Sequence, residues 1–242
     1  MTTDALNVKE KDIVVPGESL AVGMGFLPSW GTYRDGDSIR ASRLGLVQMD
    51  GKVIKLVPLS GAYLPRMGDV IIGLVIDVLM SGWRVDTFSP YSAVLTLAEA
   101  TSEFIPKKAD LTKYFDIGDV IMTKVTNVTS QNLVDVSMKG PGLRKLGPGR
   151  TLVVDPHRVP RVIGKNGSMV SMIKDHTGCN ILVGQNGVVW LSGEPENEVI
   201  TVQAIERICA ESHISGLTEK MQRWLEQNAK HVNRSRPQEP MQ

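Results

Sequence analysis

The chain has 242 residues, of which 27 are Lys or Arg and 26 are Asp or Glu, so its formal net charge is +1. This balance excludes a uniformly basic nucleic-acid coat protein and a strongly acidic disordered chain. Hydrophobic residues make up 42% of the sequence but aromatic residues only 5%, so we expect a mainly aliphatic core in one to three domains.

The first part of the chain has the pattern of β structure. The pair Asp50-Gly51 stands between two strand candidates at 38–48 and 52–57, which predicts a hairpin. The run VVPGE at 14–18 predicts a turn after a short strand. Turn-forming residues then gather between Pro58 and Pro65. We therefore expect an N-terminal β domain over residues 1–62.

The second part contains five short strand candidates. The last of them alternates, with Val134, Val136 and Met138 on one face and Asp135 and Ser137 on the other. A long connection with weak helical character follows the third candidate, at 98–118. Five short strands with one long excursion after the third fit an OB-type barrel, which we expect over residues 63–139. The candidates are 70–79, 82–88, 92–97, 119–129 and 132–138.

The third part mixes strands and helices in the order strand, helix, GxxG loop, helix, strand, strand, helix. Pro160 suits the start of the first helix, Ser168 is expected to cap the second, and Gly178 to end it. This order predicts an α+β domain over residues 147–214. The expected elements are a strand at 152–154, helices at 160–163 and from 168, strands at 180–183 and 188–191, and a helix from 195.

The connections around this domain are rich in turn formers or polar residues. The segment KGPGLRKLGPGR at 139–150 contains four Gly and two Pro and predicts a linker or an extended connection. After the domain, residues 215–242 are expected to form a helix at 218–230 and a disordered tail.

The basic charge is local. Residues 139–184 hold 8 basic and 2 acidic residues, whereas the rest of the chain is balanced or acidic. The centre of this excess is Gly164-Lys165-Asn166-Gly167, between two helix candidates. Glycines at both ends of a loop let a phosphate approach the backbone, and the following helix offers free N–H groups. Lys165 adds a charge at the tip, and the nearby cations are Arg158 and Arg161. We predict that this loop binds RNA as in a KH domain.

A second GxxG sequence, Gly184-Gln185-Asn186-Gly187, lies between two strand candidates. An Asn-Gly pair in that position is typical of a tight hairpin turn. We therefore interpret it as a structural turn without phosphate contact.

Further RNA-binding candidates lie outside the loop. Trp83 on the second barrel strand could stack on a base, although a residue that fills the barrel or an interface is the alternative. Adjacent lysines are usually solvated surface, but Lys107 and Lys108 on the long excursion could contact phosphates. The connection at 139–150 could extend this track with Arg144, Lys145 and Arg150.

The sequence offers little for catalysis. The four histidines have neither HExxH nor HxH spacing, and no paired carboxylate motif of a nuclease metal site is present. We expect no catalytic residues, no metal and no cofactor. The two cysteines, Cys179 and Cys209, are far apart and fit a reducing interior. With no secretory signal and no long apolar span, we expect a cytoplasmic protein.

Several runs together resemble one known family. They are VVPGE (14–18), PLSGAYLPRMGDVIIGLV (58–75), GWRVD (82–86), SPYSAVL (89–95), DPHRVPRVIGKNGSM (155–169) and VGQNGVVWLSG (183–193). The chain is similar over nearly all its length to the ribosomal RNA-processing protein four family, the RNA-binding cap subunits of the exosome, in its archaeal form. The resemblance implies an N-terminal domain, an S-one (OB-type) domain and a type I KH domain.

The resemblance also implies a role. Family members are non-catalytic, bind single-stranded RNA and form a trimeric cap, homotrimeric or mixed, on a hexameric ring of RNase-PH-like subunits that degrade RNA by phosphorolysis. The N-terminal domain would dock on the ring, and the cap would favour poly(A) or A-rich 3′ ends. A translation or transcription factor that reuses an S-one and KH pair is the alternative, and an enzyme in its own right is a further one.

Overall fold

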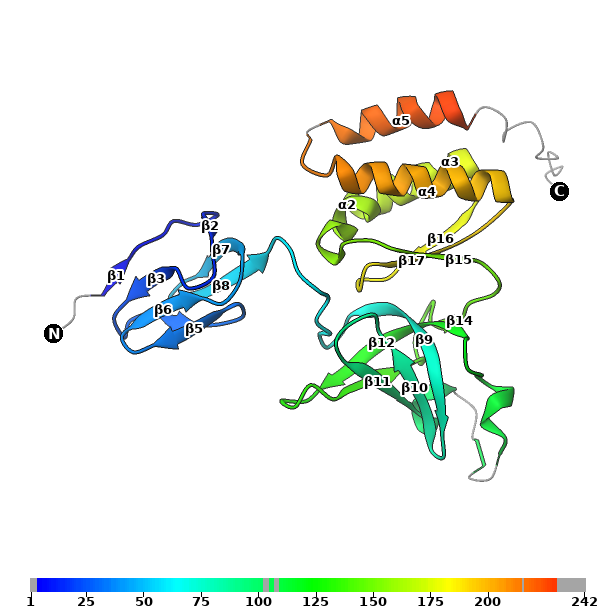
Figure 1. Cartoon of the computed structure of the whole chain (residues 1–242), viewed down its shortest axis with the longest axis horizontal. Helices are drawn as coiled ribbons and strands as arrows, with labels where there is room; N and C mark the ends of the chain where they lie inside the picture. The colour runs from blue at the N-terminus through cyan, green and yellow to red at the C-terminus, as the bar shows by residue number, and fades with distance from the viewer. Residues whose placement is uncertain (1–3, 102–104, 107–108, 215, 230–242) are drawn as a thin grey trace. The chain divides into compact units, whose positions relative to one another are not determined.

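The computed structural model describes residues 4–101, 105–106, 109–214 and 216–229, and it divides into two compact units between Gly61 and Ala62 (Figure 1). The first unit is all β. Its first sheet has the order β1 (Ala5–Leu6), β3 (Ser19–Val22), β6 (Ser38–Ala41), β5 (Thr32–Asp35). Its second sheet has the order β2 (Ile13–Val14), β7 (Gly45–Asp50), β8 (Val53–Pro58), β4 (Leu27–Pro28).

The core of the first unit contains fully buried aliphatic side chains from both sheets, among them Leu20, Ile39, Val47 and Ile54. The Asp-Gly hairpin is confirmed, since β7 and β8 pair antiparallel and Gly51 has a φ of 60°. The single strand expected at 38–48 is wrong, because β6 and β7 belong to different sheets. The chain leaves the first sheet after Ala41 and enters the second at Gly45, so the expected strand covers two strands with different partners.

The second unit begins with the predicted barrel, which the structure confirms. Its strand β13 closes the barrel by pairing parallel with β11 and antiparallel with β12. The connection between the third and fourth strands contains two short helical segments, α1 (Leu97–Ala100) and η1 (Leu111–Lys113). The five strands are β9 (Val70–Leu79), β10 (Gly82–Asp86), β11 (Ser92–Thr96), β12 (Val120–Val128) and β13 (Val134–Ser137).

Trp83 lies in the core of this barrel and is completely buried. Its indole N–H donates to the carbonyl of Phe115 at 2.8 Å, and its ring meets the Phe115 ring edge to face. A base cannot stack on a ring that is enclosed on all sides. The prediction that Trp83 contacts RNA is therefore wrong, and the alternative of a barrel-filling residue is correct.

Tyr63 anchors the start of the second unit. Its ring packs in the barrel core and its hydroxyl donates to Asp69 Oδ2 at 2.7 Å. Burial, followed by the hydrogen bond to the Asp69 carboxylate, raises the pKa of Tyr63 above its usual value. The neutral phenol is the form that the fold favours.

We predict that this raised pKa makes stability sensitive to alkali. A raised pKa contributes stability that is complete below the unfolded value, about 10 for tyrosine, and that is lost as the pH rises beyond it. Tyr63→Phe should lower the free energy of unfolding by about 2 kcal/mol at pH 7. Urea unfolding at pH 7 and pH 10.5 should show a smaller difference between the two proteins at the higher pH, and an unchanged difference would contradict the assignment.

The connection at 139–150 is ordered against the barrel. Its strand β14 (Arg144–Lys145) pairs antiparallel with β12, and Leu146 is buried and donates its N–H to the carbonyl of Val120 at 2.8 Å. Of the two alternatives for this segment, the extended connection is correct and a loose linker is not.

The rest of the second unit has the predicted order of a type I KH domain. Three antiparallel strands form a sheet in the order β15-β17-β16, helices α2, α3 and α4 lie on one face, and α5 packs on α3 and α4 (Figure 1). The strands are β15 (Arg150–Val153), β16 (Asn180–Val183) and β17 (Val188–Ser192). The helices are α2 (Val159–Ile163), α3 (Ser168–Thr177), α4 (Pro195–Ala210) and α5 (Leu217–Asn228).

The second GxxG sequence forms the turn between β16 and β17, as predicted, and the N–H of Gly184 donates to the carbonyl of Val188 at 2.8 Å. The turn also joins the KH domain to the barrel. Asn186 is 1% exposed, and its amide donates to the carbonyls of Ile72 at 2.8 Å and Thr87 at 2.9 Å. Its oxygen accepts from the N–H of Ile72 at 3.3 Å.

Gln185 makes similar hydrogen bonds to β9, two residues before Ile72. Its N–H donates to the carbonyl of Val70 at 2.9 Å, and its side-chain oxygen accepts from the N–H of Val70 at 2.6 Å. Gln185 and Asn186 thus provide hydrogen-bond partners for backbone N–H and carbonyl groups of β9 that no neighbouring strand pairs. A shared apolar cluster completes this junction, and its buried members are Ile72, Leu146, Val188 and Trp190.

Candidate nucleic-acid interface

The loop Gly164–Gly167 joins α2 to α3 through an unusual backbone path. The N–H of Gly164 donates to the carbonyl of Pro160 at 3.0 Å and ends α2. Three of the four loop residues have positive φ, namely Gly164 at 75°, Asn166 at 53° and Gly167 at 80°. Glycine and asparagine are the residues that adopt this conformation most readily.

The two glycines serve different purposes. A Cβ on Gly164 would lie 2.7 Å from the backbone nitrogen of Met169 and 2.8 Å from its Cβ, so the start of α3 leaves no room for one. A Cβ on Gly167 would meet nothing within 4 Å. Gly164 therefore lets α3 approach α2, whereas the chain at Gly167 is open for a ligand to approach the backbone.

The start of α3 differs from the expectation in one detail. Ser168 is the first helical residue, and Gly167 occupies the capping position without a side chain to accept a hydrogen bond. The prediction that Ser168 caps the helix is wrong. The first turn of α3 consequently has no side-chain cap. The N–H of Gly167 donates to the carbonyl of Gly164 at 3.3 Å, and the N–H of Ser168 donates to the carbonyl of Lys165.

Buried side chains of α2 and α3 hold the two ends of the loop. Val162 on α2 and Ile173 on α3 are completely buried, and Met169 is 4% exposed. They pack in one cluster with residues of α4 that include Ala204 and Ile205. The apolar spacing on α2 and α3 therefore holds the two helix ends in place on either side of the GxxG sequence.

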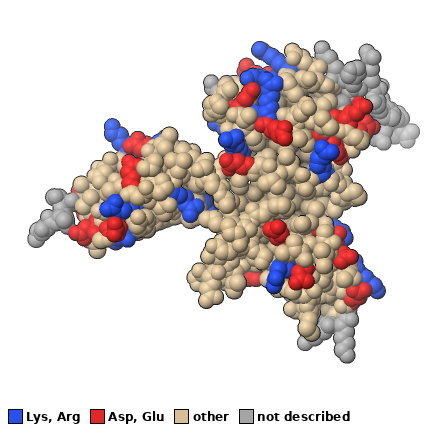
Figure 2. All heavy atoms as spheres, viewed as in Figure 1, with Lys and Arg blue, Asp and Glu red and all other residues tan. Residues whose placement is uncertain are grey.

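Two of the predicted cations are free at the loop. Arg161 and Lys165 are exposed, and neither forms an ion pair with another residue that the structure describes. On the face shown in Figure 2, Lys and Arg lie beside Asp and Glu without a large area of one sign.

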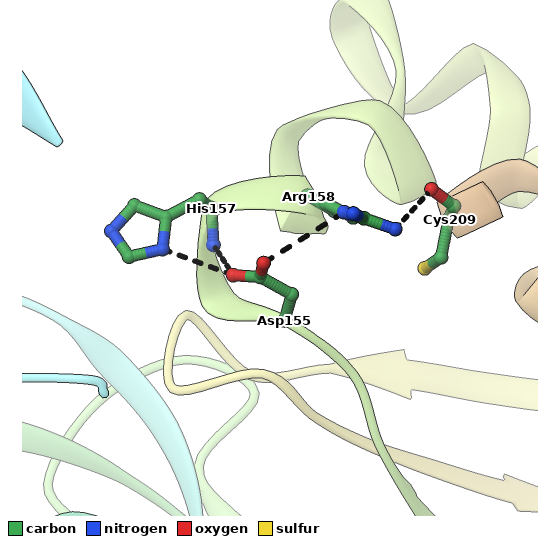
Figure 3. Close-up of polar contacts among 4 residues, drawn as sticks. All are labelled: Asp155, His157, Arg158 and Cys209. Atoms are coloured by element: carbon green, nitrogen blue, oxygen red, sulfur yellow. Dashed lines mark hydrogen bonds and ion pairs between the residues drawn. The ribbon is translucent and has the colours of Figure 1, made fainter. Parts of the chain in front are cut away.

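Arg158 is held within the chain (Figure 3). Its guanidinium lies 3.7 Å from Asp155 Oδ2 and donates to the carbonyl of Cys209, in the last turn of α4, at 2.6 Å. Asp155 also accepts from the backbone N–H and the ring of His157. Arg158 therefore fixes the start of α2 to the end of α4, where helix carbonyls favour a cation. No pattern in the sequence indicates Cys209 as its partner.

The candidates on the barrel and the connection are dispersed. Arg144 is exposed on β14, and its neighbour Lys145 forms an ion pair with Asp119. Arg150 on β15 has a weak pair with Glu198 at 3.9 Å. Lys107 and Lys108 lie outside the described residues. Arg161 lies in the last turn of α2, directly before the GxxG loop, and Arg158 lies at the start of the same helix. The described cations of the connection and of β15 lie on other elements.

No three His, Cys, Asp or Glu side chains in the described part of the chain gather closely enough to hold a metal ion. No described helix has the length and apolar character needed to cross a membrane.

Three family models match the chain in consecutive order. The "Exosome complex exonuclease RRP4 N-terminal region" matches residues 13–50, the "RRP4, S1 domain" matches 62–127, and the "KH domain" matches 149–210. The first match lies in the first unit, and the other two lie in the second, over most of the barrel and over the α+β domain.

Whole-length relatives give the same result. An exosome complex component Rrp4 from Thermococcus kodakarensis is 44% identical over 223 residues, which cover 90% of this chain and 86% of that protein. The corresponding protein of Methanothermus fervidus is 42% identical, with 91% and 97% covered. One solved crystal structure is described as that of a proposed exosome complex RNA-binding protein. Its sequence is 33% identical and its TM-score is 0.64, and the match covers 72% of this chain and 99% of that one.

Proposed function

The chain belongs to the Rrp4 family of exosome components, and from this premise we propose that it captures single-stranded RNA 3′ ends and passes them to the degrading subunits of the complex. The observation that carries the proposal is the open loop at Gly167, with its uncapped helix start and the free cations Arg161 and Lys165. Such a loop binds phosphates through the backbone and so accepts RNA of many sequences.

We propose that the chain itself is non-catalytic, although the name of the matching N-terminal model includes the word exonuclease. The described residues contain no group of three His, Cys, Asp or Glu side chains that could hold a metal ion. The purified chain should therefore leave a labelled oligoadenylate intact, with or without phosphate and divalent metal. Turnover that copurifies with the chain would favour the alternative of an enzyme in its own right.

The first unit supplies a surface for the other subunits. Val14, Val47 and Leu56 point into its core, and the alternate residues of the same strands form a row on the opposite face. In this row Ile13 pairs with Leu46, which pairs with Val57. Ile13 is 65% and Val57 46% exposed, and Val15 and Leu59 at the strand ends are exposed as well. A contiguous apolar row of this kind is typical of a protein interface.

We propose that this row docks on an RNase-PH-like hexameric ring, in a trimeric cap of identical or mixed subunits. Val57→Glu should weaken binding to the ring by at least about tenfold, because docking would bury an unpaired charge. Sedimentation of the chain mixed with purified ring subunits measures the assembly. Tyr33→Glu is the control, since it also replaces an exposed apolar side chain with glutamate, on the other sheet. Equal assembly by both variants would refute the assignment.

A translation or transcription factor would use the same two RNA-binding domains. Purification of the tagged chain from its own cells separates the two functions, because the proposed function requires ring subunits and the alternative requires ribosomes or polymerase. We also propose a preference for A-rich tails and a cytoplasmic location. Competition between oligoadenylate and oligouridylate tests the former.

A further inference from the structure

Phe88 is a strained and exposed aromatic residue on the barrel. It lies in the loop between β10 and β11, with a φ of 56° and 37% of its surface exposed. Among the described residues, Tyr33 and Phe88 are the most exposed aromatic side chains, and Tyr33 lies in the first unit. Of the described part of the second unit, Phe88 is therefore the most exposed aromatic side chain.

The backbone at Phe88 favours a different residue type. The positive-φ region is open to glycine and tolerated by asparagine, but a bulky aromatic residue there is an outlier. Of the other described non-glycine residues with positive φ, Asn132 at 61° and Asn166 at 53° follow this rule, whereas Lys11 at 70° does not. Phe88 lacks the deep burial that would offset the strain through packing, so the fold alone does not account for a phenylalanine.

The surrounding loop holds Phe88 firmly. The N–H of Phe88 donates to Asp86 Oδ1 at 2.8 Å, and the hydroxyl of Thr87 donates to the carbonyl of Tyr91 at 2.7 Å. The carbonyl of Thr87 accepts from Asn186 at 2.9 Å, which connects this loop directly to the KH domain. The ring is thus presented from a fixed backbone at the junction of the two RNA-binding domains.

We propose that Phe88 is a stacking platform for a base of single-stranded RNA on its way between the KH loop and the barrel. The loop connects the second and third barrel strands, the face through which OB-type barrels bind oligonucleotides. An exposed ring can stack on any base, which suits RNA of varied sequence. This inference rests on the proposed function, and it assigns to Phe88 the role that the buried Trp83 cannot have.

Three variants separate stacking from a structural role. Phe88→Asn removes the ring and suits the backbone, so it should leave the thermal midpoint unchanged or raise it. Phe88→Tyr keeps an aromatic face, and Phe88→Leu keeps apolar bulk without one. Tyr33→Leu is the matched control, because it removes the other exposed aromatic side chain.

The test is the affinity of the full-length chain for an oligoadenylate that contains one 2-aminopurine, whose fluorescence is quenched by stacking. Phe88→Asn and Phe88→Leu should bind between about fivefold and a hundredfold more weakly and lose quenching, whereas Phe88→Tyr and Tyr33→Leu should resemble the wild type. The slope of log affinity against log salt should stay unchanged, because no phosphate contact is removed.

Two results would overturn the inference. Wild-type affinity in Phe88→Asn would show that the ring does not contact RNA, and a lower thermal midpoint in Phe88→Asn with full affinity in Phe88→Leu would show a structural role. Either result is compatible with the proposed function, provided that variants of the GxxG loop still bind RNA more weakly than the wild type. Failure of the wild-type chain to bind RNA would instead defeat both.

Discussion

Replacing Lys165 and Asn166 together with aspartate should weaken the binding of single-stranded RNA by at least about tenfold. Both side chains are exposed, so the fold loses no packing. Asp tolerates the positive φ that Asn166 adopts, so the loop can keep its path. The two substitutions remove one positive charge and add two negative charges beside the open backbone at Gly167. Repulsion then acts at the point where a phosphate would approach.

Filter binding or fluorescence anisotropy over a series of salt concentrations measures this effect. The slope of log affinity against log salt should become shallower by about one, as expected when one cation-phosphate contact is lost. A matched control is Lys52→Asp with Gln48→Asp, which changes the charge by the same amount on exposed positions of the first unit. If both double variants bind RNA equally, the GxxG loop is not the site of phosphate contact.

Asn186→Ala should lower the free energy of unfolding of the second unit by about 3 kcal/mol or more. The substitution leaves three buried backbone groups without their partner, the N–H and carbonyl of Ile72 and the carbonyl of Thr87. Each buried polar group that loses its hydrogen bond costs about 1 to 3 kcal/mol. Asn186→Asp should be worse, because a carboxylate cannot donate to the two carbonyls and would be buried as a charge.

Urea unfolding measures the loss, and small-angle scattering of the isolated second unit measures whether the KH domain leaves the barrel. Asn180→Ala is the control, since Asn180 is exposed at the start of the same hairpin. An Asn186→Ala protein as stable as the control would show that the hydrogen bonds to Ile72 and Thr87 contribute nothing to holding the domains together.

The sequence was sufficient for elements whose pattern is local. Strands β9 and β16 have the predicted bounds, because alternation and flanking turn residues are properties of a few neighbouring positions. The same holds for the end of α3 at Gly178, which adopts the left-handed conformation expected of a helix-ending glycine. The order of elements around Gly164–Gly167 then followed, and with it the KH fold.

The sequence did not show the contacts of residues whose partners are distant in sequence. Trp83 finds its hydrogen-bond partner 32 positions away, and Asn186 finds Ile72 at a separation of 114. Arg158 is engaged by Cys209, 51 positions further along. The strand expected at 38–48 is divided between two sheets for the same reason, since pairing with other strands decides where a strand ends.

The amino-acid sequence by itself determined the family, the types of domain and the position of the GxxG loop, because glycines, charges and periodicities act over a single turn or strand. Only the tertiary structure decided which cations remain free, which aromatic ring is exposed and how the KH domain is attached to the barrel. Burial and hydrogen-bond partners arise when remote segments come together. The exposure of each candidate side chain is therefore known only once the tertiary structure shows which side chains pack in the core.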